Sequence, residues 1–338
     1  MRDPRRASAL PGDAEKAAGS RIYVACFVCF LVFCILVLVG IRLHLGIGWG
    51  NIEQANGREL VGVGLAHGVL DNLSYTAWAQ QAKHGHFVFE NLFTTEPHRP
   101  LMVNLLFWLV GRGADLLAAS PLFVMVALSL PAAALTIVCV WLVCRRIGLH
   151  QRAALLATVF VAYGSGLSVP LLALLPHRPW YRGADSSFLD AIPATVFPFY
   201  PYHTISLALA AALLFAIVVA ESSPSGRPTK AHLWLVFVAG ATAVWSHPYE
   251  PTALLVVYGV LVLSTLGSER RAELLRLRIP ILLSLSAAVL PAALYYFWIT
   301  TEPVWSAFAV ETWQIHGTRL NWLVGFGLFW PLPRSAPS

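Results

Sequence analysis

Charge is scarce in this sequence. Only 12% of its 338 residues are charged, whereas 57% are hydrophobic. An ordinary water-soluble domain carries about one charged residue in four, so the composition argues against that class. It predicts a protein whose surface mostly faces lipid.

The few charges also argue against a nucleic-acid partner. Lys and Arg number 23 against 17 Asp and Glu. Binding of nucleic acid requires basic residues gathered on one exposed face, but here they lie in the intervals between apolar runs. Their spacing indicates membrane topology instead.

Cysteine is scarce as well, and no cysteine is placed to form a disulfide in an outer loop. Cys26 and Cys29 form a C-x-x-C pair, but no second ligand pair accompanies it, which disfavours metal or redox use. All of the cysteines lie in or at the ends of apolar runs: Cys26, Cys29, Cys34, Cys139 and Cys144.

Long apolar runs, by contrast, are plentiful. A bilayer-crossing helix needs about 20 apolar residues, and seven runs approach that length. We expect an all-α fold, a polytopic transmembrane helical bundle of about seven spans after a cytoplasmic tail at residues 1–21. The first run should stay as an anchor, since no Ala-x-Ala-like cleavage site follows it. The predicted spans are 22–41, 122–144, 151–170, 203–220, 231–246, 252–267 and 279–299.

Basic residues predict the orientation, because Lys and Arg in short loops stay cytoplasmic. They precede the first run and fill every second loop, so we expect a multi-pass protein of the plasma (inner) membrane with a cytoplasmic N-terminus. Residues 101–119 must then not cross; we predict an interfacial or re-entrant helix interrupted at Gly111, Arg112 and Gly113. The basic residues in question are Arg2, Arg5, Arg6, Lys16, Arg21, Arg145, Arg146, Arg152, Arg227, Lys230, Arg270, Arg271, Arg276 and Arg278.

The transmembrane domain is expected to cover residues 22–338. Residues 321–330 begin like an eighth span, but the stretch PLPRSAPS follows before that span is long enough to cross. We therefore expect a partial eighth span and a truncated product.

The first outer loop, residues 42–121, is long and rich in ionisable residues, which favours function. Residues 72–84 read as a helix that Asp71 can cap, with Gly85 after its end. Asp71, Ser74, Tyr75 and Trp78 recur on one side of it. Asp71 is either a cap, or a carboxylate that accepts a proton from a hydroxyl or holds a metal, and both roles are compatible.

Further candidates follow in the same loop. His84, His86 and Glu90 are metal-type ligands but match no compact motif, so solvated histidines are the default. The stretch TTEPHRP, stiffened by two prolines, presents Glu96, His98 and Arg99. Arg99 can clamp a phosphate or lie anchored in the headgroup layer.

Two other outer segments carry ionisable groups at the predicted membrane edge. The turn WSHPYEP presents His247 and Glu250, and FPFYPYHT brings His203 to the start of a span. A tight turn requires no ionisable pair, and such groups at membrane depth are functional candidates by default. The neighbouring aromatic residues form an interfacial belt or stacking platforms for sugar rings.

Three stretches carry a family resemblance: LDNLSYTAWAQQAKHGHFVFENLFTTEPHRP, SHPYEP and YYFWITTEPVWSAFAVETWQ. They resemble bacterial multipass GT-C membrane glycosyltransferases. The resemblance implies inverting transfer of a hexose or pentose from a polyprenyl-phosphate donor to a glycan, lipid or protein acceptor at the extracytoplasmic face. Asp71 would be the catalytic base, and substrate would meet Tyr75, Glu96, His98, Arg99, His203, His247 and Glu250.

The chain departs from the family pattern at Asn72, where a second acid is common. That departure weakens a metal-chelating version, although the resemblance leaves a divalent metal open. A rival interpretation is a transporter or lipid-carrier flippase, for which ionisable residues at midplane and matching broken helices are expected. Gly164, Ser165, Gly166 and Pro170 give one broken segment, but no charge lies deep in a predicted span.

Overall fold

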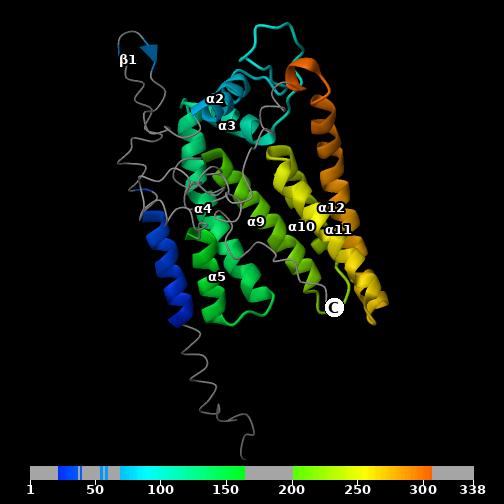
Figure 1. The fold of residues 1–338 in the computed structure, drawn as a ribbon. Coiled ribbons are helices and arrows are strands. Elements are labelled where there is room, and N and C mark those ends of the chain that lie inside the picture. The colour runs from blue at the N-terminus through cyan, green and yellow to red at the C-terminus, as the bar shows by residue number, and fades with distance from the viewer. Residues whose placement is uncertain are drawn as a thin grey trace, which may run out of the picture.

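The computed structural model describes residues 22–36, 39, 54–55, 58–59, 69–163 and 201–306 (Figure 1). Helices dominate this part of the chain. Two strands of two residues each, β1 (Gln54–Ala55) and β2 (Arg58–Glu59), pair antiparallel. The helices are Ile22–Leu36, α2 (Val69–Lys83), α3 (Leu105–Leu116), α4 (Pro121–Arg146), α5 (Gln151–Tyr163), α9 (Pro201–Glu221), α10 (Lys230–Ser246), α11 (Tyr249–Ser264), the 3-10 turn η3 (Thr265–Gly267) and α12 (Arg271–Ile299).

Each of the seven predicted spans contains a helix, which confirms the all-α class. Four helices are long and apolar enough to cross a membrane: α4, α9, α11 with η3, and α12. The helix Ile22–Leu36 and α5 are apolar but shorter within the described residues, and α10 has 17 residues. Residues 1–21 and 307–338, with the expected tail and partial eighth span, lie outside the described part, as do residues 164–200.

The helix in 101–119 differs from its prediction in one respect. α3 runs through Gly111, Arg112 and Gly113 without interruption. The reason is contact with α2: a Cβ atom at Gly111 would lie 2.3 Å from the carbonyl oxygen of Ala79, so the glycine lets the two helices touch. At 12 residues α3 is about 18 Å long, too short to cross the roughly 30 Å of a bilayer.

Two other boundaries also differ. α2 begins at Val69, so Asp71 lies in its first turn and not before it. α12 begins at Arg271, so Arg276 and Arg278 belong to a helix where a loop was expected. Arg278 lies there because its guanidinium meets the carboxylate of Glu221, with Nε 3.2 Å from an oxygen.

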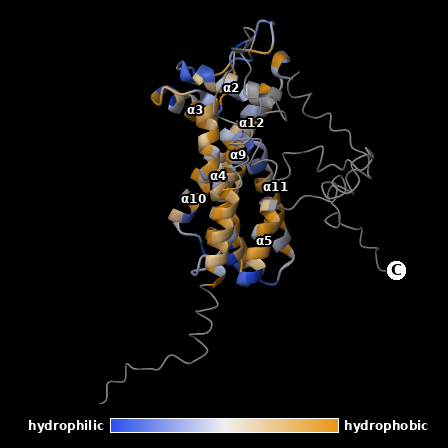
Figure 2. Ribbon diagram, turned by 90° about the vertical axis from the view of Figure 1, so that its left-hand side faces the viewer, coloured by the Kyte–Doolittle hydropathy of each residue, from blue (hydrophilic) through white to orange (hydrophobic). Residues whose placement is uncertain are grey.

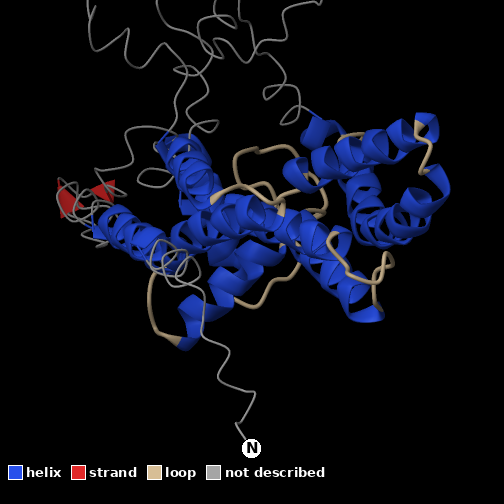
Figure 3. Ribbon diagram, turned by 90° about the horizontal axis from the view of Figure 1, so that it is seen from below, coloured by secondary structure: helices blue, strands red, loops and turns tan. Residues whose placement is uncertain are grey.

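The helices pack in three connected apolar clusters. The start of α9 packs with α2, α3 and the start of α4, around Trp78 and Phe107. The rest of α9 packs with α10, α11 and α12, around Leu213 and Leu285. Ile22–Leu36 packs with α5 and the later part of α4, around Trp141. α4 and α9 pack against each other. Seen from below, helices make up almost all of the described part of the chain (Figure 3).

The bundle has two different ends. α2, α3 and residues 84–104 lie across one end, which we call the cap end, beside the starts of α4, α9 and α11 (Figures 1 and 2). The opposite end, the basic end, holds the α4–α5, α9–α10 and α11–α12 connections. Of the described Lys and Arg, Arg58 lies in β2, Lys83, Arg99 and Arg112 lie at the cap end, and the basic end holds Arg145, Arg146, Arg152, Arg227, Lys230, Arg270, Arg271, Arg276 and Arg278.

Candidate functional site

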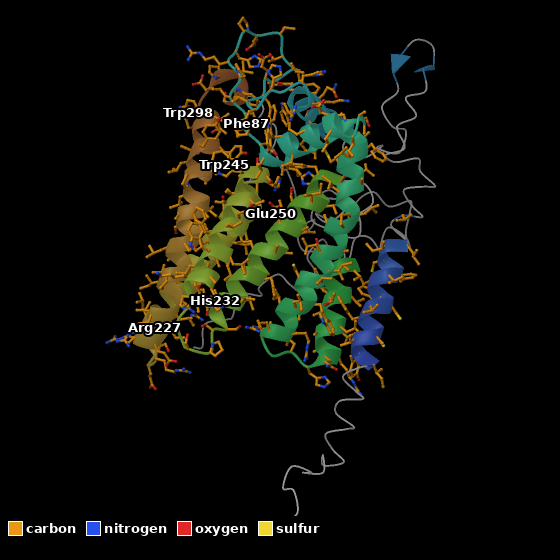
Figure 4. All side chains as sticks on the ribbon, turned by 180° about the vertical axis from the view of Figure 1, so that it is seen from behind. Phe87, Arg227, His232, Trp245, Glu250 and Trp298 are labelled. Atoms are coloured by element: carbon orange, nitrogen blue, oxygen red, sulfur yellow. The ribbon has the colours of Figure 1, made fainter. Side chains whose placement is uncertain are left out.

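A turn at the cap end brings two ionisable side chains together. α10 ends at Ser246, His247 follows in extended conformation, and Pro248 precedes the first residue of α11. This turn places Nδ1 of His247 in hydrogen-bonding contact with a carboxylate oxygen of Glu250. His247 is only 9% exposed, and Glu250 is half-buried. Figure 4 shows Glu250 toward the end of the bundle marked by Phe87, away from Arg227.

A second histidine joins this pair from α9. The rings of His203 and His247 meet edge to face with their centres 5.4 Å apart. Nε2 of His203 also lies 3.3 Å from the hydroxyl oxygen of Tyr75, which comes from α2. We call Tyr75, His203, His247 and Glu250 the His–Glu cluster. Four of the predicted site residues, distant in sequence, thus form one continuous set of contacts.

Aromatic rings fix the position of the cluster. The Tyr75 ring lies 4.3 Å from that of Tyr202 and 5.5 Å from that of Phe107, measured between centres. The Tyr202 ring also meets His247 edge to face at 5.4 Å. α2, α3 and α9 therefore hold these histidines against a packed aromatic wall.

Asn104 forms the polar part of this wall, and we did not predict it from the sequence. Its side chain caps α3 by accepting from the N–H of Phe107 at 3.0 Å, and donates to the carbonyl oxygen of Ser246 at 2.7 Å. The Tyr202 hydroxyl donates to the same carbonyl at 2.7 Å. An asparagine at the start of an apolar run signals a cap, but nothing in the sequence links it to a residue 142 positions later.

Two tyrosines of α12 hold the chain that leads into α3. The Tyr296 hydroxyl donates to the carbonyl oxygen of Val103 at 2.5 Å. Tyr295 donates to the carbonyl of Leu101. The last turns of α12 are thereby joined to residues 101–103, just before Asn104.

Glu96, His98 and Arg99 lie in the segment 84–104 and not among the contacts of the His–Glu cluster. His98 accepts from the N–H of Asn91 at 3.0 Å through Nε2, and Nδ1 lies 2.8 Å from the carbonyl oxygen of Glu96. Its ring also meets Trp305 edge to face. This histidine therefore organises its own loop, whereas Glu96 and Arg99 are exposed. Their roles toward substrate stay predictions.

Asp71 lies on α2 one helical turn before Tyr75. The backbone thus places it in the same helix as one member of the cluster. Its side chain lies outside the described part, and its role as catalytic base stays a prediction.

Metal ligation finds no support in the part of the chain that the structure describes. No three His, Cys, Asp or Glu side chains there are close enough to share an ion. His84, His86 and Glu90 are all exposed. The Glu90 carbonyl instead accepts from Trp78 Nε1 at 3.1 Å, which makes that residue part of the loop's attachment to α2.

The arrangement has a definite acid–base capacity. When Nδ1 of His247 donates to Glu250, a neutral imidazole presents Nε2 as a proton acceptor. Tyr249, 62% exposed with its ring 5.1 Å from His247, adds an accessible aromatic face.

No protein-family model, curated protein or solved structure matches this chain.

Proposed function

We propose that this protein is a membrane glycosyltransferase of the GT-C type. It would transfer a hexose or pentose from a polyprenyl-phosphate donor to a glycan, lipid or protein acceptor. The reaction would take place at the extracytoplasmic face of the plasma (inner) membrane, with the N-terminus in the cytoplasm. The observation that carries the proposal is the His–Glu cluster, which gathers proton-handling groups at the cation-poor end of an apolar bundle.

The chemistry requires a proton acceptor and a place for a leaving phosphate. The acceptor hydroxyl oxygen attacks the anomeric carbon, and the bond from that carbon to the phosphate oxygen breaks. Polyprenyl phosphate departs with the bonding electrons, and the hydroxyl proton passes to a base. The donor's tail lies in the bilayer, so its phosphate reaches the level at which spans end.

Individual roles follow from position and chemistry. Asp71 is the base that the resemblance implies, and it lies one turn from Tyr75 on α2. His203, His247 and Glu250 would hold the sugar and acceptor hydroxyls, with Tyr75 hydrogen-bonded to them through His203. Arg99 and His98, with Glu96, belong to the loop that would cover the donor, where the guanidinium can neutralise phosphate charge.

One observation favours the second candidate, a transporter or lipid-carrier flippase. A partly buried ion pair, Glu221 with Arg278, joins α9 to α12 at the basic end, and the Tyr258 hydroxyl donates to Glu221 at 2.5 Å. Ionisable clusters thus occur at both ends of α9. A transporter would need such a cluster as a gate at each side of the membrane. Substrate movement across vesicles without any sugar transfer would support that candidate.

The direct test measures transfer in membranes that contain the full chain. Radiolabelled polyprenyl-phosphate hexoses and pentoses are supplied, and incorporation into endogenous acceptors is counted. We expect His247→Gln and Glu250→Gln each to lower the rate by about 100-fold, because both residues would hold hydroxyls in position and misplaced reacting groups typically cost that much. Asp71→Asn should lower it at least as much.

Glu90→Gln serves as the matched control, because it removes an exposed carboxylate from the same end without touching the cluster. We expect its rate to equal that of the unmodified protein. If the His247, Glu250 and Asp71 variants transferred sugar as fast as the unmodified protein, at equal protein level, the proposal would be refuted. So would the absence of transfer from every donor by the unmodified protein.

A further inference from the structure

A groove opens between α10 and α12 at the basic end, far along the helices from the His–Glu cluster. Its volume is about 230 Å³, and its lining consists of Lys230, Leu233, Trp234 and Phe237 of α10 with Ser284 of α12. The proposed sugar transfer makes no use of it. The groove requires its own explanation.

The α10 residues of the groove form an ordered stripe. Lys230 is the first residue of the helix, Leu233 and Trp234 lie one turn on, and Phe237 lies two turns on. At 1.5 Å per residue, the stripe from Lys230 to Phe237 extends about 10 Å along the helix. Along the stripe, the groove surface therefore changes from the cation of Lys230, to the indole of Trp234, to the purely apolar ring of Phe237.

A molecule bound in the groove would contact mainly apolar groups of its wall. The Ser284 hydroxyl donates to the carbonyl oxygen of Leu233 at 2.7 Å, so this polar group is satisfied within the wall. Trp234 is 65% exposed, and its ring meets Phe237 edge to face at 5.5 Å. Exposed Trp at a helix end is typical of the level where headgroups meet acyl chains.

We propose that this groove binds one anionic phospholipid of the surrounding bilayer. Lys230 would contact the lipid phosphate, and one acyl chain would lie along Leu233, Trp234 and Phe237. Charge complementarity selects an anionic lipid over a zwitterionic one, because Lys230 is the charged residue in the groove lining. The site is distinct from any donor site at the cap end.

Native mass spectrometry of the purified full chain tests this proposal. The protein in detergent is mixed with phosphatidylglycerol or phosphatidylcholine of equal chain length. The dissociation constant of the first bound lipid is then measured for each. We expect phosphatidylglycerol to bind at least about fivefold more tightly than phosphatidylcholine, because one cation beside an anionic headgroup contributes about that factor. Lys230→Gln should remove that preference and leave phosphatidylcholine binding unchanged.

Two further variants separate this groove from general basic charge. Arg146→Gln removes an exposed cation from the same end on α4 and should leave the preference intact. Phe237→Ala should weaken binding of both lipids, since it shortens the apolar stripe. Equal binding of the two lipids by the unmodified protein, an unchanged preference in Lys230→Gln, or an equal loss in Arg146→Gln would overturn the assignment.

Discussion

A single amide, that of Asn104, joins three helices at the cap end. It caps α3, donates to the last carbonyl of α10 at Ser246, and lies 3.4 Å from the Tyr202 hydroxyl of α9. Its side chain is almost completely buried, at 1% exposure. Removing it would leave the buried N–H of Phe107 without this partner and the Ser246 carbonyl with one donor fewer, which costs more than the loss of a surface cap.

We expect Asn104→Ala to lower the free energy of unfolding by about 2–3 kcal/mol, the sum of a lost cap and a buried carbonyl left with one donor fewer. Ser120→Ala is the matched control, because Ser120 caps α4 through the N–H of Phe123 at 3.1 Å but is exposed. That variant should lose only about 1 kcal/mol. Thermal unfolding in detergent measures both, and equal losses would contradict the role of Asn104.

Part of the site was predictable at the scale of residues. His247 and Glu250 lie three positions apart around Pro248, so a turn there brings them together by local geometry alone. The contact between Tyr75 and His203 joins residues 128 positions apart, and helix packing decides it. Sequence pattern selected both residues because they lie at the edge of apolar runs, but it could not pair them. The same limit explains why Asn104 was missed.

At the scale of elements, the position of α2 depends on its close approach to α3. A Cβ atom at Gly111 would lie 2.4 Å from Cβ of Ala82 and 2.6 Å from the backbone nitrogen of Lys83. These neighbours are backbone or short side chains, so they cannot move aside. α2 carries Tyr75 and Asp71, and any shift of that helix reaches the cluster.

We therefore expect Gly111→Ala to lower the free energy of unfolding by about 1–3 kcal/mol through overpacking, and to lower sugar transfer as well. Gly113→Ala is the matched control in the same helix, since its Cβ would meet Val124 at an ordinary 3.5 Å. That variant should keep both stability and activity, because alanine favours a helix over glycine. Equal behaviour of the two variants in thermal unfolding and transfer assays would contradict this account.

Hydropathy placed a helix in every predicted span, because a long apolar run is a local property of the chain. The ends of the spans 22–41 and 151–170 lie outside the described residues, and α12 begins eight residues before its predicted span. The ends were less predictable. α12 extends past three arginines since the Glu221 carboxylate receives Arg278 and exposed Glu273 pairs with Arg270. These partners come from tertiary packing or helix-surface spacing, which composition does not report. For the same reason, Gly111 and Gly113 signalled a break, but α3 continues through both, and Gly111 is the point where α2 touches it.

At the scale of the whole molecule, charge is sorted along the bundle axis. The described cations lie mostly at the basic end, and the His–Glu cluster lies at the other. Short loops rich in Lys and Arg stay in the cytoplasm. The account therefore depends on the cap end facing outward, where a lipid-linked sugar would be bound.

Chemical labelling of single introduced cysteines in intact cells tests this orientation most directly. The native cysteines are first replaced. A single cysteine is then introduced either at Thr95, in the exposed cap-end loop, or at Ser225, in the α9–α10 connection. With a membrane-impermeant thiol reagent, we expect the cysteine at position 95 to react in intact cells. The one at position 225 should react only after permeabilisation. Reaction at position 225 with protection at position 95 would contradict the central claim.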